Sequence, residues 1–199
     1  VLAWVVFAMN QQAERINFMT KAGILSLSNL KGHFWKKTMN QEMVDKANKI
    51  YDEGSMSELY EFIKPFLKKD DPYALYLYSC FSLADWNESD EEYDKRYVDS
   101  LTKAAEGNVA EAMHQLAALY FVGDGVELDV EKGKRYLDSA MRLNYGIAKF
   151  SVGINTYHGS NGYPKDIEKA FELVSEAILD DVEGASEALE KMKLLSDQE

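Results

Sequence analysis

The chain has 199 residues, of which 46% are hydrophobic and 28% are charged, proportions that are ordinary for a globular protein. Its formal net charge is −12, from 22 basic and 34 acidic residues. Because an acidic body repels phosphate backbones and anionic lipids, we expect neither a nucleic acid nor a membrane surface as its partner. The single cysteine, Cys80, excludes an intramolecular disulfide and a metal cage built from cysteines.

Residues 1–38 differ from the rest of the chain in charge and in pattern. They carry a net charge of +4, which leaves −16 for residues 39–199. The apolar stretch at 1–9 is far shorter than the about 20 residues of a membrane span, and no signal-peptide flanks surround it. We therefore expect residues 1–38 to be an atypical leader that is disordered or not part of the fold. We expect a cytoplasmic protein, or an exported one if this segment is a truncated signal sequence.

From Met39 onward the chain becomes acidic, periodic and well capped. Ser55 with Glu58, and Ser89 with Glu92, have the spacing of capping boxes, and Pro72 suits a first helical turn. No stretch alternates apolar and polar residues for long, so no sheet is expected. The predicted helices cover about 41–52, 56–68, 72–85, 90–106, 109–121, 129–143, 147–157, 167–180 and 184–195.

The second half of the chain repeats itself. Ala112 and Ala148 are 36 positions apart, Ala148 and Ala185 are 37 apart, and four further pairs of identical residues are also 37 apart. A fixed period of this length is typical of helical repeat proteins. The four pairs are Gly125 and Gly162, Asp129 and Asp166, Lys132 and Lys169, and Ala140 and Ala177.

The repeated pattern resembles the Sel1-like repeat, which is related to the tetratricopeptide repeat. Each unit has a small residue, a Leu-Gly-like pair, a tyrosine, a glycine-rich turn, an aspartate and a Lys-Ala-like pair. The units cover about 110–145 and 146–182. Two departures are that Ala117 replaces the glycine and Gly133 replaces the alanine in the first unit. The second turn, Gly159–Gly162, reads Gly-x-x-Gly instead of Gly-x-Gly.

The resemblance implies an all-α fold, an α-α superhelix of four helix pairs and a final helix. Residues 72–108 read as a degenerate repeat, and the helices at 41–68 and 184–195 as capping units. Small residues such as Ala140 and Ala177 allow helices to approach closely, while Asp129 and Asp166 can cap the second helix of each pair. The larger residues expected between repeats are Leu116, Tyr120, Tyr136, Val152 and Tyr157.

No catalytic, cofactor or metal site is expected. The histidines His33, His114 and His158 are far apart, and no nucleophile with a nearby base is visible in the sequence. Cys80 lies in an apolar segment and reads as a buried, inert thiol. The sequence therefore does not indicate an enzyme.

Sel1-like proteins act as adaptors, so the resemblance implies that the chain is a protein-protein interaction module with a protein or peptide partner. The repeat register places Tyr73, Tyr76, His114, Phe121, Phe150 and Ile154 on the concave face, where they are the candidate binding residues. Among these, Tyr76, His114 and Phe150 would form one aromatic row.

Three alternatives stay open. These rings could simply pack between neighbouring repeats. The protein could be a regulatory or immunity-type inhibitor whose acidic surface masks a basic partner. A hydrolase, which some Sel1-like proteins have been claimed to be, is the third.

Overall fold

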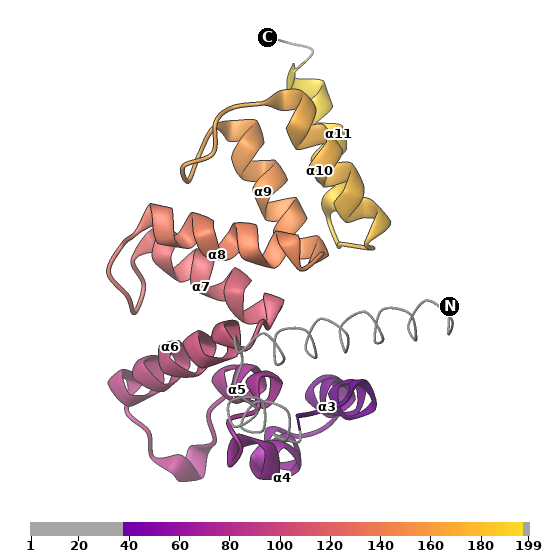
Figure 1. Cartoon of the computed structure of the whole chain (residues 1–199). Helices are drawn as coiled ribbons and strands as arrows, with labels where there is room; N and C mark the ends of the chain where they lie inside the picture. Colours follow the sequence, from indigo (N-terminus) through magenta and orange to yellow (C-terminus); the bar gives the residue numbers. More distant parts are fainter. Residues whose placement is uncertain (1–37, 197–199) are drawn as a thin grey trace, which may run out of the picture. The chain divides into compact units, whose positions relative to one another are not determined.

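The computed structural model describes residues 38–196, so the leader expected at 1–38 lies outside the described residues except for Thr38. Within this range the chain forms nine α-helices and one short 3₁₀-helix, without a strand (Figure 1). The helices are α3 (Gln41–Glu53), α4 (Met56–Leu67), α5 (Pro72–Ser79), η1 (Ala84–Trp86), α6 (Asp90–Glu106), α7 (Ala110–Val122), α8 (Val130–Arg142), α9 (Gly146–His158), α10 (Ile167–Leu179) and α11 (Ala185–Ser196).

Polar side chains cap the N-termini of most of these helices, at the positions predicted from the sequence. Asp129 and Asp166 accept hydrogen bonds from the backbone N–H of Lys132 and Lys169, the first-turn donors that a helix leaves unpaired. Ser89 and Glu92 form a complete capping box. Pro72 occupies the first turn of α5, as predicted.

Each helix packs mainly against the one before it and the one after it in sequence, which makes the described region an all-α solenoid. The pairs α7–α8 and α9–α10 share the most contact (Figure 1). Leu116, Val152 and Tyr157 are buried between helices, as expected. Tyr120 and Tyr136 are only half-buried, and their rings stack on each other at 5.8 Å.

Helix α5 is shorter than the predicted 72–85. It ends at Ser79, and the chain reaches α6 through η1. The Arg96 guanidinium on α6 donates hydrogen bonds to the carbonyl oxygens of Tyr78, at 2.6 Å, and Phe81, at 2.9 Å. These carbonyls thereby find partners without a continuing helix.

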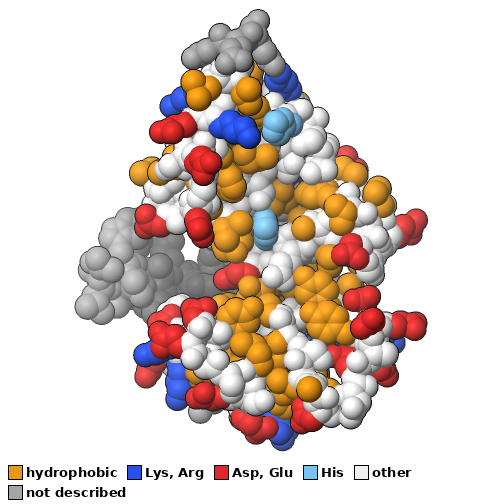
Figure 2. All heavy atoms as spheres, turned by 180° about the vertical axis from the view of Figure 1, so that it is seen from behind, with side chains coloured by type: hydrophobic (Ala, Val, Ile, Leu, Met, Phe, Trp, Pro, Cys, Tyr) orange, Lys and Arg blue, Asp and Glu red, His pale blue; other side chains and the backbone are white. Residues whose placement is uncertain are grey.

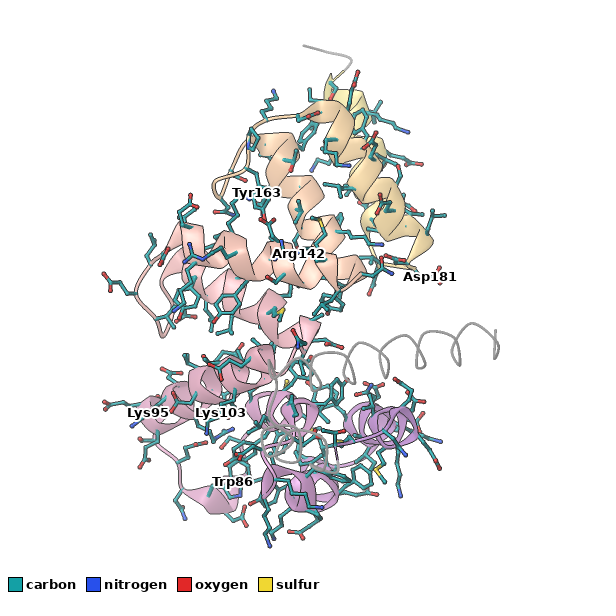
Figure 3. The ribbon with its side chains drawn as sticks, in the orientation of Figure 1. Trp86, Lys95, Lys103, Arg142, Tyr163 and Asp181 are labelled. Carbon is teal, nitrogen blue, oxygen red and sulfur yellow. The ribbon has the colours of Figure 1, made fainter. Side chains whose placement is uncertain are left out.

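The same guanidinium binds the loop that follows. It forms an ion pair with Glu88, with contacts of 2.6 and 2.8 Å, and lies over the rings of Tyr78 and Trp86. Figure 3 labels Trp86 in this loop, which joins α5 to α6. A planar group with five donors suits this arrangement, whereas a lysine ammonium does not.

Replacing Arg96 with lysine should lower the free energy of unfolding by about 1.5–3 kcal/mol, since charged hydrogen bonds to two carbonyls and a carboxylate are lost. Urea titration measures this change. Lys95→Ala is the matched control, because Lys95 is exposed on the same helix and should change stability by less than about 0.5 kcal/mol (Figure 3). If Arg96→Lys and Lys95→Ala lowered the free energy of unfolding equally, the hydrogen bonds of Arg96 would not stabilise the fold.

One glycine and one alanine face each other where the helices of each repeat cross. In the first repeat a Cβ on Gly133 would lie 3.0 Å from the carbonyl oxygen of Ala117. In the second, a Cβ on Gly153 would lie 3.3 Å from the carbonyl oxygen of Ala170. The two departures from the repeat pattern in the first unit therefore compensate each other: glycine and alanine have exchanged helices.

The loop of the second repeat locks onto the first repeat. Tyr163 is buried, and its hydroxyl donates a hydrogen bond of 2.8 Å to Asp138 on α8 (Figure 3). Lys134 pairs with the same carboxylate at 2.8 Å and lies over the Tyr163 ring at 4.4 Å. These contacts fix the second repeat on the first.

Gly153→Ala should destabilise the protein by about 1–2 kcal/mol, although alanine favours helix, because the new methyl group would lie 2.8 Å from Val174 Cγ2. A double-mutant cycle with Val174→Ala, read by urea unfolding, tests the cause. The cost of Gly153→Ala should shrink once the valine methyl groups are gone. An unchanged cost would show that the close approach of α9 and α10 is not responsible.

Candidate functional site

A hollow of about 290 Å³ opens between α7, α8 and α9. We call it the apolar hollow; its lining residues are His114, Ala117, Ala118, Phe121, Leu137, Phe150, Ser151, Ile154 and Asn155. It is formed by two consecutive repeats, because α7 and α8 belong to the first and α9 to the second. Figure 2 shows hydrophobic side chains gathered along the middle of one face of the molecule.

Four of the six predicted binding residues line the apolar hollow, namely His114, Phe121, Phe150 and Ile154. Tyr73 and Tyr76 do not line it. The Tyr73 hydroxyl donates to Asn48 at 2.9 Å, and the two tyrosine rings lie 5.6 Å apart in the hydrophobic clusters around α5. The structure thus brings His114 and Phe150 together, without Tyr76. A binding role for these residues stays a prediction.

His114 and Ser151 make a contact that the sequence did not reveal. His114 Nε2 lies 2.9 Å from Ser151 Oγ, and the imidazole meets the Tyr145 ring edge-on at 5.9 Å. Ser151 directly follows Phe150, the residue that the repeat register aligns with His114, so the closeness of neighbouring first helices is the signal that could have found the pair. The contact ties α7 to α9 across the hollow.

This pair corrects the expectation that no nucleophile lies near a base, but its surroundings do not favour hydrolysis. Ser151 is inside α9, where backbone N–H groups are used by the helix and cannot stabilise an oxyanion. No carboxylate of the described residues bonds to His114. Burial lowers the pKa of His114, which makes it a weaker base.

A second hollow of about 670 Å³ adjoins the first, and Phe150 lines both. We call it the acidic hollow; its lining residues are Asn144, Tyr145, Gly146, Ile147, Phe150, Asp180, Asp181, Val182 and Glu183. Lys149 is buried and pairs with Asp180 at 2.7 Å. Burial, and to a lesser extent the charge of Glu111, raise the pKa of Tyr145 to about 12.

A third hollow, lined by Tyr60, Tyr78, Trp86, Glu88 and Glu92, has aromatic walls that could suit a cation. The ring centres lie only 5.0 to 6.2 Å apart, so the rings touch one another. The guanidinium of Arg96 already covers Tyr78 and Trp86. We therefore assign this cluster to holding the loop after α5.

The remaining chemistry of the described region is structural. Cys80 is half-buried, not buried as predicted, and its Sγ lies 3.3 Å from the carbonyl oxygen of Tyr76. Burial raises the pKa of this thiol, which keeps it protonated and unreactive. Residues 38–196 contain no group of three side chains that could hold a metal ion, and none of their helices is long and apolar enough to cross a bilayer.

The repeat geometry agrees with the comparison against protein families. The model of the Sel1 repeat matches residues 110–145 and 147–180. These segments contain the pairs α7–α8 and α9–α10, each with its glycine–alanine crossing. The chain is therefore a Sel1-like repeat protein, and Sel1 repeats generally mediate protein interactions.

Solved structures with the same fold support this assignment. A Sel1 repeat protein from Oxalobacter formigenes is 25% identical, with a TM-score of 0.55 over 65% of this chain and 95% of that one. A protective antigen of uropathogenic Escherichia coli, c5321, is 16% identical, with a TM-score of 0.59 over 84% of this chain and 36% of that one. Cysteine rich protein B of Helicobacter pylori is 18% identical, with a TM-score of 0.50 over 68% of this chain and 95% of that one. No curated protein sequence matches the chain.

The partly buried imidazole of His114 makes stability depend on pH. Its pKa is lowered in the folded state, so the unfolded chain binds a proton first as pH falls below about 6.5. The stability that the folded protein gains by keeping His114 neutral is therefore present above about pH 6.5 and is lost as pH falls below it. Urea unfolding between about pH 7.5 and about pH 5.5 should show a smaller loss for His114→Gln than for the unchanged protein. If the free energy of unfolding fell equally with pH in both proteins, His114 would not be the group responsible.

Proposed function

We propose that the protein is an adaptor that binds a protein partner in the apolar hollow of its two Sel1 repeats. The observation that carries this proposal is that apolar side chains of α7 and α9 border an open hollow instead of being covered by a neighbouring helix. Ala118 is exposed, and Phe121, Phe150 and Ile154 are only half-buried. Half-buried aromatic and aliphatic groups around a concavity are typical of sites for anchor side chains.

The size of the hollow favours a side chain of a partner over a cofactor. At about 290 Å³ it lies at the lower end of the range for small-molecule sites. Its only charged or titratable lining group is His114, which burial keeps neutral. An apolar anchor residue on a peptide or helix fits these properties.

The alternative of an inhibitor with an acidic surface is distinguished by salt. Binding through the −16 net charge of residues 39–199 would weaken steeply as ionic strength rises, whereas apolar anchoring would persist. The hydrolase alternative is not supported, because Ser151 lacks the donors that an acyl-transfer intermediate needs.

Capture of partners from the source cell by the full chain tests the proposal. Phe150→Ala should weaken binding of the captured partner by about 1–3 kcal/mol, because it removes an anchor contact at the residue that lines both hollows. The free energy of unfolding should change much less than binding. Isothermal titration and urea unfolding measure the two effects.

Leu128→Ala is the matched control, since Leu128 is 59% exposed in the loop between α7 and α8, outside both hollows. It should leave binding unchanged. If Leu128→Ala weakened binding and Phe150→Ala did not, the loops would be the binding site. If Phe150→Ala unfolded the protein, the ring would be a packing element and the hollow would lose its proposed role.

A further inference from the structure

The charged side chains that line the two adjoining hollows all carry a negative charge. No lysine or arginine lines either the apolar or the acidic hollow. Three carboxylates, those of Asp180, Asp181 and Glu183, line the acidic hollow. Figure 2 shows red side chains beside the central hydrophobic strip, whereas blue side chains gather mainly toward the two ends of the molecule.

Only one of these three carboxylates is neutralised within the protein. Lys149 pairs with Asp180 and also approaches Glu176 at 3.7 Å, and its own side chain is 10% exposed. Asp181 and Glu183 are exposed, and no cation of the described residues lies within ion-pair distance of them. A partner placed on Phe150 would therefore meet two uncompensated negative charges beside an apolar pocket.

The backbone holds Asp181 at a fixed place in the repeat. It adopts a left-handed conformation with φ of 55° in the turn after α10 (Figure 3). Asn108 and Asn144, which end the preceding repeats, adopt the same conformation with φ of 65° and 63°. Asparagine suits this backbone as well as aspartate does. Folding alone thus does not require a charge at this position, where the earlier repeats carry a neutral amide.

We propose that the two hollows bind one peptide segment, with an apolar side chain in the apolar hollow and a neighbouring lysine or arginine against Asp181 and Glu183. The proposal rests on the proposed function and names the chemistry of its partner. Phe150 joins the two parts of the site, because it lines both hollows. The occupant is an apolar and basic segment of another protein, since opposite charge is what this border can recognise.

A phage-displayed library of random peptides, panned against the full-length protein, tests this chemistry without a known partner. The selected peptides should share an apolar residue with lysine or arginine close to it. A synthetic peptide of the selected sequence should lose affinity about two- to fivefold for each charge removed by Asp181→Asn or Glu183→Gln. Addition of salt should reduce this difference.

Asp94→Asn with Asp99→Asn is the control for Asp181→Asn combined with Glu183→Gln, because both residues are exposed on α6 and the two pairs remove the same total charge. The double variant on α6 should leave the affinity unchanged. Asp181→Asn should also leave the unfolding free energy unchanged, because asparagine occupies the same turn in the earlier repeats.

Each other outcome overturns a distinct claim. Selected peptides that need Phe150 but show no basic residue would refute the acidic contact and leave the apolar site standing. Equal loss of affinity in the control variant would assign the effect to the overall charge. Selection of no peptide, or sedimentation as a dimer that hides Phe150, would refute peptide binding in the hollows and with it the proposed function.

Discussion

The close crossing of two helices within each repeat is the constraint on which the rest of the structure depends. Two helices can approach each other this closely only if one of the two facing residues is glycine, which has no side chain. The first repeat meets this need with Gly133 facing Ala117, and the second with Gly153 facing Ala170. Either helix can supply the glycine, because the contact is set by the sum of the two side chains. A second methyl group at either crossing would meet neighbouring atoms at 2.7 to 2.8 Å.

The same crossing shapes the candidate site. A Cβ on Gly133 would lie 2.7 Å from the ring of Phe121, so the missing side chain is what gives this ring its place in the wall of the apolar hollow. Tyr163, bonded to Asp138, then fixes the second repeat and brings Phe150 opposite that wall. The apolar hollow therefore depends on helix packing within the first repeat and on the Tyr163–Asp138 hydrogen bond between the two repeats.

Local signals explain how much could be predicted from the sequence. Helix α6 was predicted at its observed bounds and α8 within a residue, because caps such as Asp129 and the 37-residue period lie in contiguous sequence. The predicted end of α5 was wrong because Arg96, which binds the carbonyl oxygens of Tyr78 and Phe81, belongs to the following helix. A degenerate repeat offers no motif from which such a contact could be inferred.

The candidate site was predictable where the repeat register is intact. His114 and Phe150 lie together because both come from clear repeats. Tyr76 does not line the apolar hollow, because α5 has only eight residues and the register of a full first helix does not apply to it. Ser151 was missed because the repeat register aligns His114 with Phe150 and does not say which neighbouring side chain bonds to the imidazole.

Binding of a partner in the apolar hollow is the central claim. Site-specific photo-crosslinking tests it most directly, since it reports contact in the cell and does not depend on measuring an affinity. A photoreactive phenylalanine analogue would replace Ala118, which is exposed in the apolar hollow, or Glu172, which is exposed on α10 and lines neither hollow. Our account predicts a crosslinked partner from position 118 and none from position 172. Crosslinking of the same partner from position 172 alone would contradict binding in the hollow.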